Sequence, residues 1–272
     1  MSAARFGLLP LLALLPAALV AQGRAFPYEL TRSDIGIASA GAVSAGLGFL
    51  SQSNVEAPTS AEIATLDRSS VNPFDRGATW NWSEDWQEVS DWTRDGLVAA
   101  AGLVTFLPVL VDSRWSEAAT LGVILAETAA FTCGVTNLTK AATQRRRPYL
   151  YNDAFSVDER ARFARESGQG ALSFPSGHTS VAFAAATFLS TTYADLHGPT
   201  RASRWIWFSS LGAASLVGVA RVQGGKHFPT DVLVGAAVGA AAGHLIPRFH
   251  RVGGPPIDVV ATPRYLGLRV SF

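Results

Sequence analysis

The sequence predicts an all-α fold, a helical bundle embedded in a membrane, and two observations support this class. Of the 272 residues, 48% are hydrophobic and only 16% are charged, whereas a typical soluble domain has about 25% charged residues. Apolar runs long enough for helices lie at about residues 96–111, 118–140, 178–193, 205–220 and 229–246. Their many Gly, Ala, Ser and Thr residues suit close packing of helices in a membrane. Several runs are shorter than the roughly 20 residues of a straight span, so a soluble helical bundle is the alternative.

The start of the chain has the pattern of an export signal. Arg5 supplies a minimal positive region, residues 8–20 are apolar, and the small residue Ala21 offers a cleavage site. We therefore predict a signal peptide over residues 1–21. A short uncleaved anchor is the alternative interpretation.

A polar segment separates this signal from the main bundle. Residues 22–95 are predicted to be exported, with one weakly apolar helix at about residues 34–50. Residues 51–92 are polar and irregular, and they contain tryptophans at positions 80, 82, 86 and 92. These rings either anchor at a membrane interface or pack against the helices, and both interpretations stay open.

The main helical domain is predicted over residues 96–250. Within it, residues 141–175 form a polar loop of 35 residues between two apolar runs. A connection of this length in a compact domain is usually functional. The tail at residues 251–272 contains the pattern of one strand, in which Tyr265, Leu266, Leu268, Val270 and Phe272 supply the apolar positions.

Charge and cysteine content exclude several classes of function. The net charge is only +1, so there is no broad basic surface for nucleic acid. Cys133 is the single cysteine, which excludes an intrachain disulfide, and we expect it to be a packing residue. The histidines are spread along the chain without a cysteine cluster, so we predict no zinc site and expect neither a metal nor a cofactor.

Basic residues close the second apolar run of the main domain. Lys140 and Arg147 are about two helical turns apart and can lie on one face, while Pro148 disfavours a helix at Arg147. An arginine can bind a phosphate through two hydrogen bonds, and a lysine adds a point charge. We interpret the neighbouring Arg145 and Arg146 as anchors at the membrane interface.

The segment from Ser173 to Thr179 directly precedes the next apolar run. It contains Pro175, Ser176, Gly177 and His178. A helix that starts here leaves main-chain N–H groups free to attract an anion, and glycine lets the backbone approach a ligand closely. His178 would stand beside that anion and could donate a proton. A plain helix cap is the alternative interpretation.

The segment from Arg221 to Asp231 precedes the last apolar run. Asp231 follows His227 by four residues, close enough to hold one imidazole nitrogen by a hydrogen bond and to leave the other free to attack. Arg221 could reach the same anion, and Lys226 is expected to be a solvated or interfacial charge. A loop with a structural His–Asp pair is the alternative interpretation.

All three segments lie at helix ends that an antiparallel bundle brings to the same side. Lys140 ends one helix, His178 starts the next, Arg221 ends the third and His227 precedes the fourth. Packing such helices in an up–down order places these residues at one end. We therefore predict an active site at one mouth of the bundle.

The combined pattern Lys-x6-Arg-Pro, Pro-Ser-Gly-His and Arg-x5-His-x3-Asp resembles the type-2 phosphatidic acid phosphatase and vanadium haloperoxidase superfamily. The resemblance covers residues 140–231. It implies that a phosphate is bound by Lys140, Arg147, Ser176, Gly177 and Arg221. It also implies that the nucleophile, its orienting partner and the general acid are His227, Asp231 and His178. The family usually has a serine where this chain has Ala220, which removes a hydroxyl but no charge.

This resemblance implies a metal-independent phosphatase that forms a phosphohistidine and hydrolyses a phosphomonoester or pyrophosphate, in this setting that of a lipid. Two arginines, one lysine and the N–H groups of a helix start can stabilise the charge that Mg²⁺ stabilises in other phosphotransfer enzymes. The alternatives are a soluble periplasmic acid phosphatase and a haloperoxidase, in which vanadate would be the cofactor. A non-catalytic membrane protein that binds lipid headgroups is a further alternative.

The number of membrane crossings determines which side the site faces. After a cleaved signal, five spans put the motifs on the exported side, and a sixth span at residues 34–50 would put them in the cytoplasm. The weak hydrophobicity of residues 34–50 favours five spans. Arg201, Arg204, Arg248 and Arg251 would then lie in the cytoplasm, as positive loops usually do. We predict a bacterial-type inner membrane protein with a periplasmic site.

Overall fold

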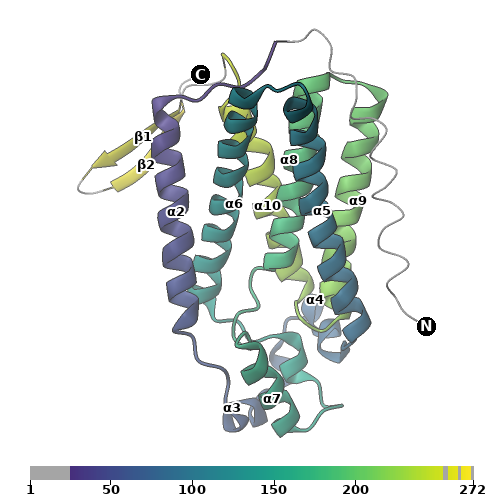
Figure 1. Ribbon diagram of the computed structural model, residues 1–272. Helices are drawn as coiled ribbons and strands as arrows, with labels where there is room; N and C mark the ends of the chain where they lie inside the picture. The colour runs from purple at the N-terminus through teal and green to yellow at the C-terminus, as the bar shows by residue number, and fades with distance from the viewer. Residues whose placement is uncertain (1–24, 254–256, 263–264, 271–272) are drawn as a thin grey trace.

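The computed structural model describes residues 25–253, 257–262 and 265–270. The predicted signal peptide at residues 1–21 lies outside these residues. In the described part, long helices run side by side (Figure 1): α2 (Arg32–Ser53), α5 (Glu84–Val111), α6 (Trp115–Thr143), α8 (Gly177–His197), α9 (Arg201–Gln223) and α10 (Pro229–Phe249). The predicted all-α bundle is confirmed.

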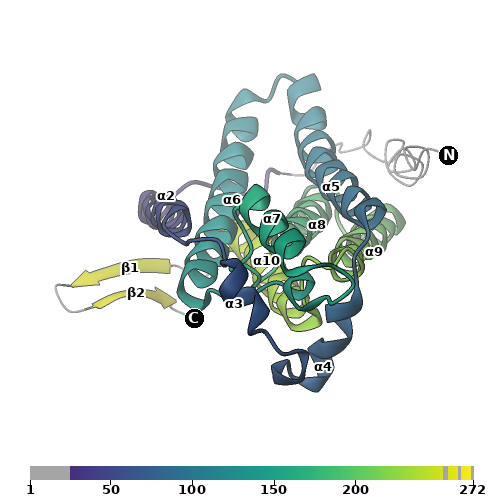
Figure 2. The ribbon, with the colours of Figure 1, turned by 90° about the horizontal axis from the view of Figure 1, so that it is seen from below.

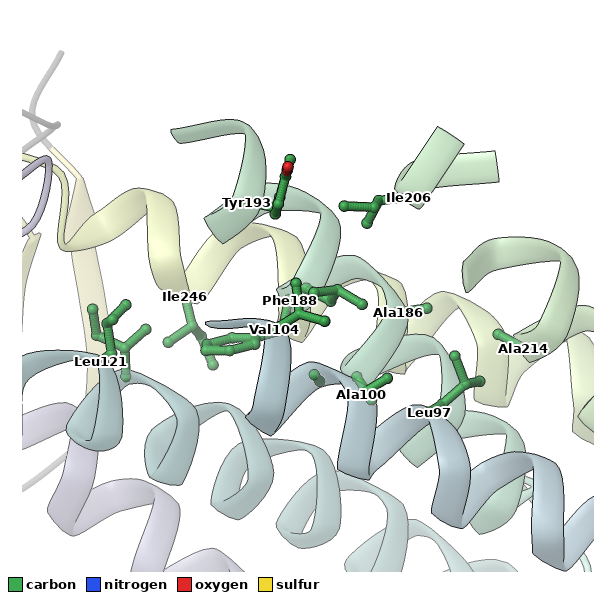
Figure 3. Close-up of a cluster of buried hydrophobic side chains, with 14 of the residues drawn as sticks. Leu97, Ala100, Val104, Leu121, Ala186, Phe188, Tyr193, Ile206, Ala214 and Ile246 are labelled. Atoms are coloured by element: carbon green, nitrogen blue, oxygen red, sulfur yellow. The ribbon is translucent and has the colours of Figure 1, made fainter. Parts of the chain in front are cut away.

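Helix α8 is the centre of the bundle, in contact with α5, α6, α9 and α10, as the view from below shows (Figure 2). Its inward positions and those of its neighbours form one apolar core, part of which Figure 3 shows around Phe188, Val104 and Ile246. Helix α2 lies outside this group and packs on α6. Predicted site residues lie at the ends of α8 and of three helices that pack against it, α6, α9 and α10.

Glycines let α10 lie directly on the main chain of α8. Gly235, Gly239 and Gly243 recur every four residues along one face of α10. A Cβ atom on Gly239 would lie 2.0 Å from the carbonyl oxygen of Ser180, and one on Gly243 would lie 2.2 Å from that of Ala184. Only hydrogen fits at these positions, so the two backbones touch without a layer of side chains between them.

Among the described residues, five helices are long and apolar enough to cross a membrane, namely α2, α5, α6, α9 and α10. Their outward side chains include Leu103, Leu107 and Leu233, which are about half exposed or more. Helix α8 does not meet that criterion because it contains many Ser and Thr residues, whose hydroxyls bond to carbonyls within the bundle. Residues 34–50, which the sequence left as a doubtful span, form one of the five.

Helix α5 begins at Glu84 rather than near Gly96, because Ser83 caps it by accepting the N–H of Trp86.

Several short elements at one end of the bundle lie in stretches that the sequence predicted to be irregular. Residues 51–83 contain α3 (Ser60–Ala64), η3 (Arg68–Ser70), α4 (Pro73–Arg76) and η4 (Gly77–Trp80). The loop at residues 141–175 contains η5 (Pro148–Tyr151) and α7 (Val157–Ser167). The predictions of irregular structure were therefore wrong in part.

The sequence left two roles open for the tryptophans, and Trp82 and Trp92 differ in their surroundings. Trp82 stacks on Phe163 at 4.7 Å between ring centroids and meets Tyr149 edge-on, so it packs beneath the bundle. Trp92 remains 70% exposed, on a helix that is apolar enough for a membrane. Packing is therefore the role of Trp82, and the interfacial interpretation survives for Trp92.

The tail forms two strands where the sequence predicted one. Strands β1 (Ile257–Thr262) and β2 (Tyr265–Val270) pair antiparallel, with Ile257 opposite Val270 and Thr262 opposite Tyr265. The ribbon lies beside α2 at the end of the bundle away from α3 and α7 (Figure 1).

Candidate active site

The ends of four helices meet at the end of the bundle where α3, α4 and α7 lie (Figures 1 and 2). They are the last turns of α6 and α9 and the first turns of α8 and α10. The antiparallel arrangement expected from the sequence is therefore present. It brings together the predicted residues Lys140, Arg147, Ser176, Gly177, His178, Arg221, His227 and Asp231.

Two of the predicted cations are buried and bond only to uncharged oxygens of the described part of the chain. Lys140 is 5% exposed, and its Nζ donates to the carbonyl of Leu172 at 2.9 Å. Arg147 is 3% exposed and donates to the carbonyl and side-chain oxygens of Gln169 at 2.8 and 2.6 Å. A buried charge without a counter-ion is costly. These two cations therefore favour an anion between them.

Arg221 adds a third buried cation from the last turn of α9. Its Nη1 donates to Oγ of Ser90 at 3.2 Å and lies 3.8 Å from Oδ1 of Asp91. Its Nε has no hydrogen-bond partner among the described residues. Part of the guanidinium is thus free to bind a ligand, in the fork geometry that suits a phosphate.

The start of α8 supplies main-chain N–H groups to the same place. Ser176 caps the helix by accepting from Thr179, and its own N–H bonds to the carbonyl of Asp231 at 2.9 Å. A Cβ atom on Gly177 would lie 3.9 Å from Nζ of Lys140. The helix start thus faces a lysine, and it can bind an anion by its dipole and its free N–H groups.

His178 lies in the first turn of α8, where it contacts helix α5. Its Nε2 is 2.7 Å from Oδ1 of Asp91, and Arg94 contacts the same nitrogen. Burial and the charges of Arg221 and Arg94 lower the pKa of His178, while the carboxylate of Asp91 beside the ring opposes this effect and favours the protonated imidazole. His178 also lines a pocket of about 160 Å³ between α5, α6 and α8, together with Arg94, Thr132, Cys133, Thr136, Asn137, Gly177 and Val181.

His227 is fully buried in the loop between α9 and α10. Burial and nearby cations hold the pKa of His227 well below its usual range, so the imidazole is neutral at pH 7. Those cations are Arg147, Lys140 and Arg221. A neutral imidazole has a free electron pair and is the form that attacks.

The contact between His227 and Asp231 is longer than the sequence predicted. Nδ1 of His227 lies 3.6 Å from Oδ2 of Asp231, beyond hydrogen-bond length. The same Oδ2 accepts from Oγ of Ser173 at 2.6 Å and from the N–H of Phe228 at 2.9 Å. Asp231 therefore faces the correct nitrogen at ion-pair distance, but two other donors occupy its nearer oxygen.

The interpretation of Arg145 as a membrane anchor was wrong. Its guanidinium bridges two buried carboxylates, at 2.6 Å to Asp231 and 2.7 Å to Asp75. Arg146 instead pairs with the half-exposed Glu62 at 2.9 Å. Arg145 therefore belongs to the surroundings of His227, while Arg146 lies at the periphery of the same end.

Sequence reasoning also missed residues on helix α5 and in the loop after α9. Ser90, Asp91 and Arg94 reach the site because α5 extends below the apolar run from which it was predicted. Lys226 is neither solvated nor interfacial, since its Nζ lies over the rings of Trp82 and Tyr149 at 4.8 and 5.2 Å. Burial and the charges of Arg147 and Arg221 lower the pKa of Lys226 to about 8.

The part of the chain that carries the predicted site residues matches a known family. The family model of the PAP2 superfamily matches residues 119–253. The lipid A 1-phosphatase of Porphyromonas gingivalis is 42% identical over 83 residues, which are 30% of this chain and 17% of that protein. The probable diacylglycerol pyrophosphate phosphatase 1 of Schizosaccharomyces pombe is 35% identical over 94 residues, 33% of each chain. The chain thus spans a third or less of these two relatives.

One solved structure is similar over most of the chain. It is the crystal structure of the first transmembrane PAP2 type phosphatidylglycerolphosphate phosphatase from Bacillus subtilis, with 16% identity and a TM-score of 0.43. The similarity covers 90% of this chain and 92% of that one.

Proposed function

Because this chain belongs to the PAP2 superfamily through residues 119–253, we propose that it is a membrane phosphatase that removes a phosphate from a lipid through a phosphohistidine at His227. The observation that supports this most is the burial of one neutral histidine among three cations. Lys140, Arg147 and Arg221 are each 6% exposed or less. Their charges can hold a phosphate dianion beside the imidazole.

The first chemical step is an in-line attack of His227 on phosphorus. Nδ1 faces Asp231, so Nε2 is the nitrogen that forms the N–P bond. The bond from phosphorus to the leaving oxygen breaks, and that oxygen takes a proton from His178. The cations and the helix start of α8 stabilise the three equatorial oxygens during the transfer. Asp231 stabilises the positive charge that develops on the imidazole.

The second step releases inorganic phosphate. A water attacks phosphorus opposite the N–P bond and gives a proton to His178, which now acts as a base. The N–P bond breaks and returns the electron pair to Nε2 of His227. No step in this scheme needs a metal ion, because the cations provide the positive charge.

We propose a lipid as the substrate because the site opens next to apolar helices. The pocket beside His178 lies on the side where the leaving group departs, and it is bounded by α5 and α6, two helices apolar enough to cross a membrane. The two relatives are named for lipid A 1-phosphate and diacylglycerol pyrophosphate. A lipid phosphomonoester or pyrophosphate fits both observations.

The proposed location of the site is the exported side of the membrane. The opposite end of the bundle holds the α8–α9 connection and the end of α10, with Arg201, Arg204, Arg248 and Arg251. Positive loops usually stay in the cytoplasm. Helix α2 starts at this same end, where Glu29 and His250 are hydrogen-bonded. A cleaved signal at residues 1–21 would leave the chain on the exported side before α2. In the proposed orientation a spanning α2 starts in the cytoplasm, so the two cannot both hold.

The decisive experiment is phosphate release by the detergent-extracted protein in excess EDTA. A prenyl pyrophosphate, phosphatidic acid and a soluble aryl phosphate are compared side by side, each with wild type and His227→Ala. We expect EDTA-insensitive release from a lipid by wild type. The variant should lose turnover while it still binds substrate. Turnover retained by His227→Ala would contradict the assigned nucleophile, and release from the aryl phosphate alone would contradict a lipid substrate.

A further inference from the structure

Arg145 connects the candidate nucleophile to a part of the chain outside the matched family domain. Its Nη1 lies 2.6 Å from Oδ1 of Asp231, and its Nη2 lies 2.7 Å from Oδ2 of Asp75. Both carboxylates are fully buried. Asp75 lies in α4, well before residue 119 where the domain begins. A single guanidinium thus pairs with one carboxylate inside the domain and one outside it.

Asp75 also holds the first turn of α10 directly. Its Oδ1 accepts the main-chain N–H of Thr230 at 2.9 Å, and its Oδ2 accepts the hydroxyl of the same residue at 2.6 Å. The N–H groups of a first helical turn lack partners within the helix, so a carboxylate there is well placed. Thr230 immediately precedes Asp231, and Asp75 therefore fixes the turn that carries the orienting carboxylate.

The two oxygens of Asp231 are held by different partners. Oδ1 accepts from Arg145, whereas Oδ2 accepts from Ser173 and Phe228 and is the oxygen nearer His227, at 3.6 Å. Rotation of the carboxylate would break these bonds together. The stack of Arg145 on the ring of Phe228, at 4.2 Å, further limits movement of the guanidinium.

We propose that Arg145 and Asp75 are positioning residues for His227: they fix the carboxylate of Asp231 so that it faces the imidazole during phosphoryl transfer. This proposal rests on the proposed function, in which His227 becomes the phosphorylated group. As positive charge develops on the ring, a carboxylate in a fixed orientation stabilises it without reorganisation. A carboxylate without Arg145 would be buried and unpaired, and would turn towards other donors.

The test compares Arg145 with its neighbour in the sequence. Arg145→Gln, Arg145→Lys and Asp75→Asn are the test variants. Arg146→Gln is the matched control, because Arg146 also ties this segment to the N-terminal part, through Glu62, but does not contact Asp231. Each protein is purified in detergent and assayed for kcat and KM with phosphatidic acid, and for binding of orthovanadate as a phosphate mimic.

We expect Arg145→Gln to lower kcat about 100-fold, the usual cost of a displaced catalytic group. Vanadate affinity and KM should change by less than about threefold, because the three phosphate-binding cations are untouched. Asp75→Asn should lower kcat by about tenfold, Arg145→Lys should recover part of the loss, and Arg146→Gln should match wild type. In the double variant Asp75→Asn, Arg145→Gln, kcat should fall no further than in Arg145→Gln, as expected for one network.

Phosphoenzyme trapping separates this proposal from the proposed function. Acid quenching with ³²P-labelled phosphatidic acid should trap a phosphoenzyme in wild type, and Arg145→Gln should form it more slowly. An equal rate of formation in both, or equal losses in kcat and vanadate affinity, would overturn the positioning role. Absence of a phosphoenzyme from wild type, together with an active His227→Ala variant, would instead overturn the proposed function.

Discussion

At the scale of single residues, the site has an uneven distribution of charge. Lys140 and Arg147 bond to carbonyl or amide oxygens, whereas Arg145 pairs with two buried carboxylates. The carboxylates of Asp75 and Asp231 therefore pair with Arg145, and Lys140 and Arg147 form no ion pair with a carboxylate in the described part of the chain. Lys140 and Arg147 can therefore attract an anion to the imidazole of His227.

Asp91 provides a prediction at this scale, because it contacts the candidate acid His178 at 2.7 Å. Asp91→Asn removes the charge that favours the protonated imidazole, so protonation of the leaving group should slow. We expect kcat to fall about tenfold with an alkyl phosphate such as phosphatidic acid, a modest part of a general-acid effect. With p-nitrophenyl phosphate the loss should stay below about threefold, because that leaving group needs no proton.

The control for this comparison is Asp95→Asn. Asp95 pairs with Arg94 at 2.8 Å and is largely exposed, so its loss changes the local charge equally without touching His178. Equal losses on both substrates in Asp91→Asn would mean that Asp91 acts on phosphate binding rather than on the acid.

The sequence predicted the residues of the site that lie within short motifs at helix ends. Lys140 and Arg147, or His227 and Asp231, are held near each other by local geometry, so their spacing is informative. Asp75 and Arg145 meet only because α4 packs under α10, and nothing in the spacing of two residues so far apart reports this contact. Asp91 was missed for another reason: helix α5 begins at Glu84, in a polar stretch where hydrophobic periodicity gives no signal.

At the scale of helices, the approach of α10 to α8 determines the geometry of the site. Ser176 and His178 start α8, while Asp231 lies in the first turn of α10. Because the backbones touch at Gly239 and Gly243, no layer of side chains separates α8 from α10 at these positions. Changes in side-chain packing there cannot alter the distance between the two helices.

Gly239→Ala tests this contact. The added Cβ would lie 2.0 Å from the carbonyl oxygen of Ser180, so α10 must move away from α8. Forced overpacking of this kind costs about 1–3 kcal/mol, and we expect a lower apparent Tm in detergent and a lower kcat. Gly212→Ala in α9 is the control, since a Cβ there meets nothing within 4 Å, and its Tm should stay equal or rise. Wild-type values in Gly239→Ala would show that the contact can relax.

At the scale of the whole molecule, the two ends of the bundle have different characters. One end gathers the candidate site beneath α3, α4 and α7, and the other holds the start of α2, the α8–α9 connection and the end of α10 (Figure 1). Hydropathy predicted the helical class correctly because each long helix is apolar over most of its length. The number of spans was less accessible, since α8 is a central helix rich in hydroxyls and α2 is the least buried of the five apolar ones.

Cysteine labelling tests the proposed orientation. Cys133→Ser removes the single cysteine, and Glu166→Cys or Pro199→Cys then marks the site end or the opposite end, at exposed positions. With a membrane-impermeant maleimide on intact cells, we expect labelling of Glu166→Cys, and labelling of Pro199→Cys only after permeabilisation. The reverse pattern would place the site in the cytoplasm. In that orientation α2 could span the membrane after a cleaved signal.

The backbone contact between α8 and α10 has a consequence for the lipid environment. Bilayers differ in thickness, and helices respond by tilting or sliding, at a modest cost per ångström. Soft side-chain layers between helices can take up such movements, but two main chains in contact leave no layer to compress. Helices α2 and α9, which lie outside α10 and α8, can adjust to a thinner or thicker bilayer while the two central helices move as one body. Such a protein would keep its catalytic geometry in membranes of quite different lipid composition.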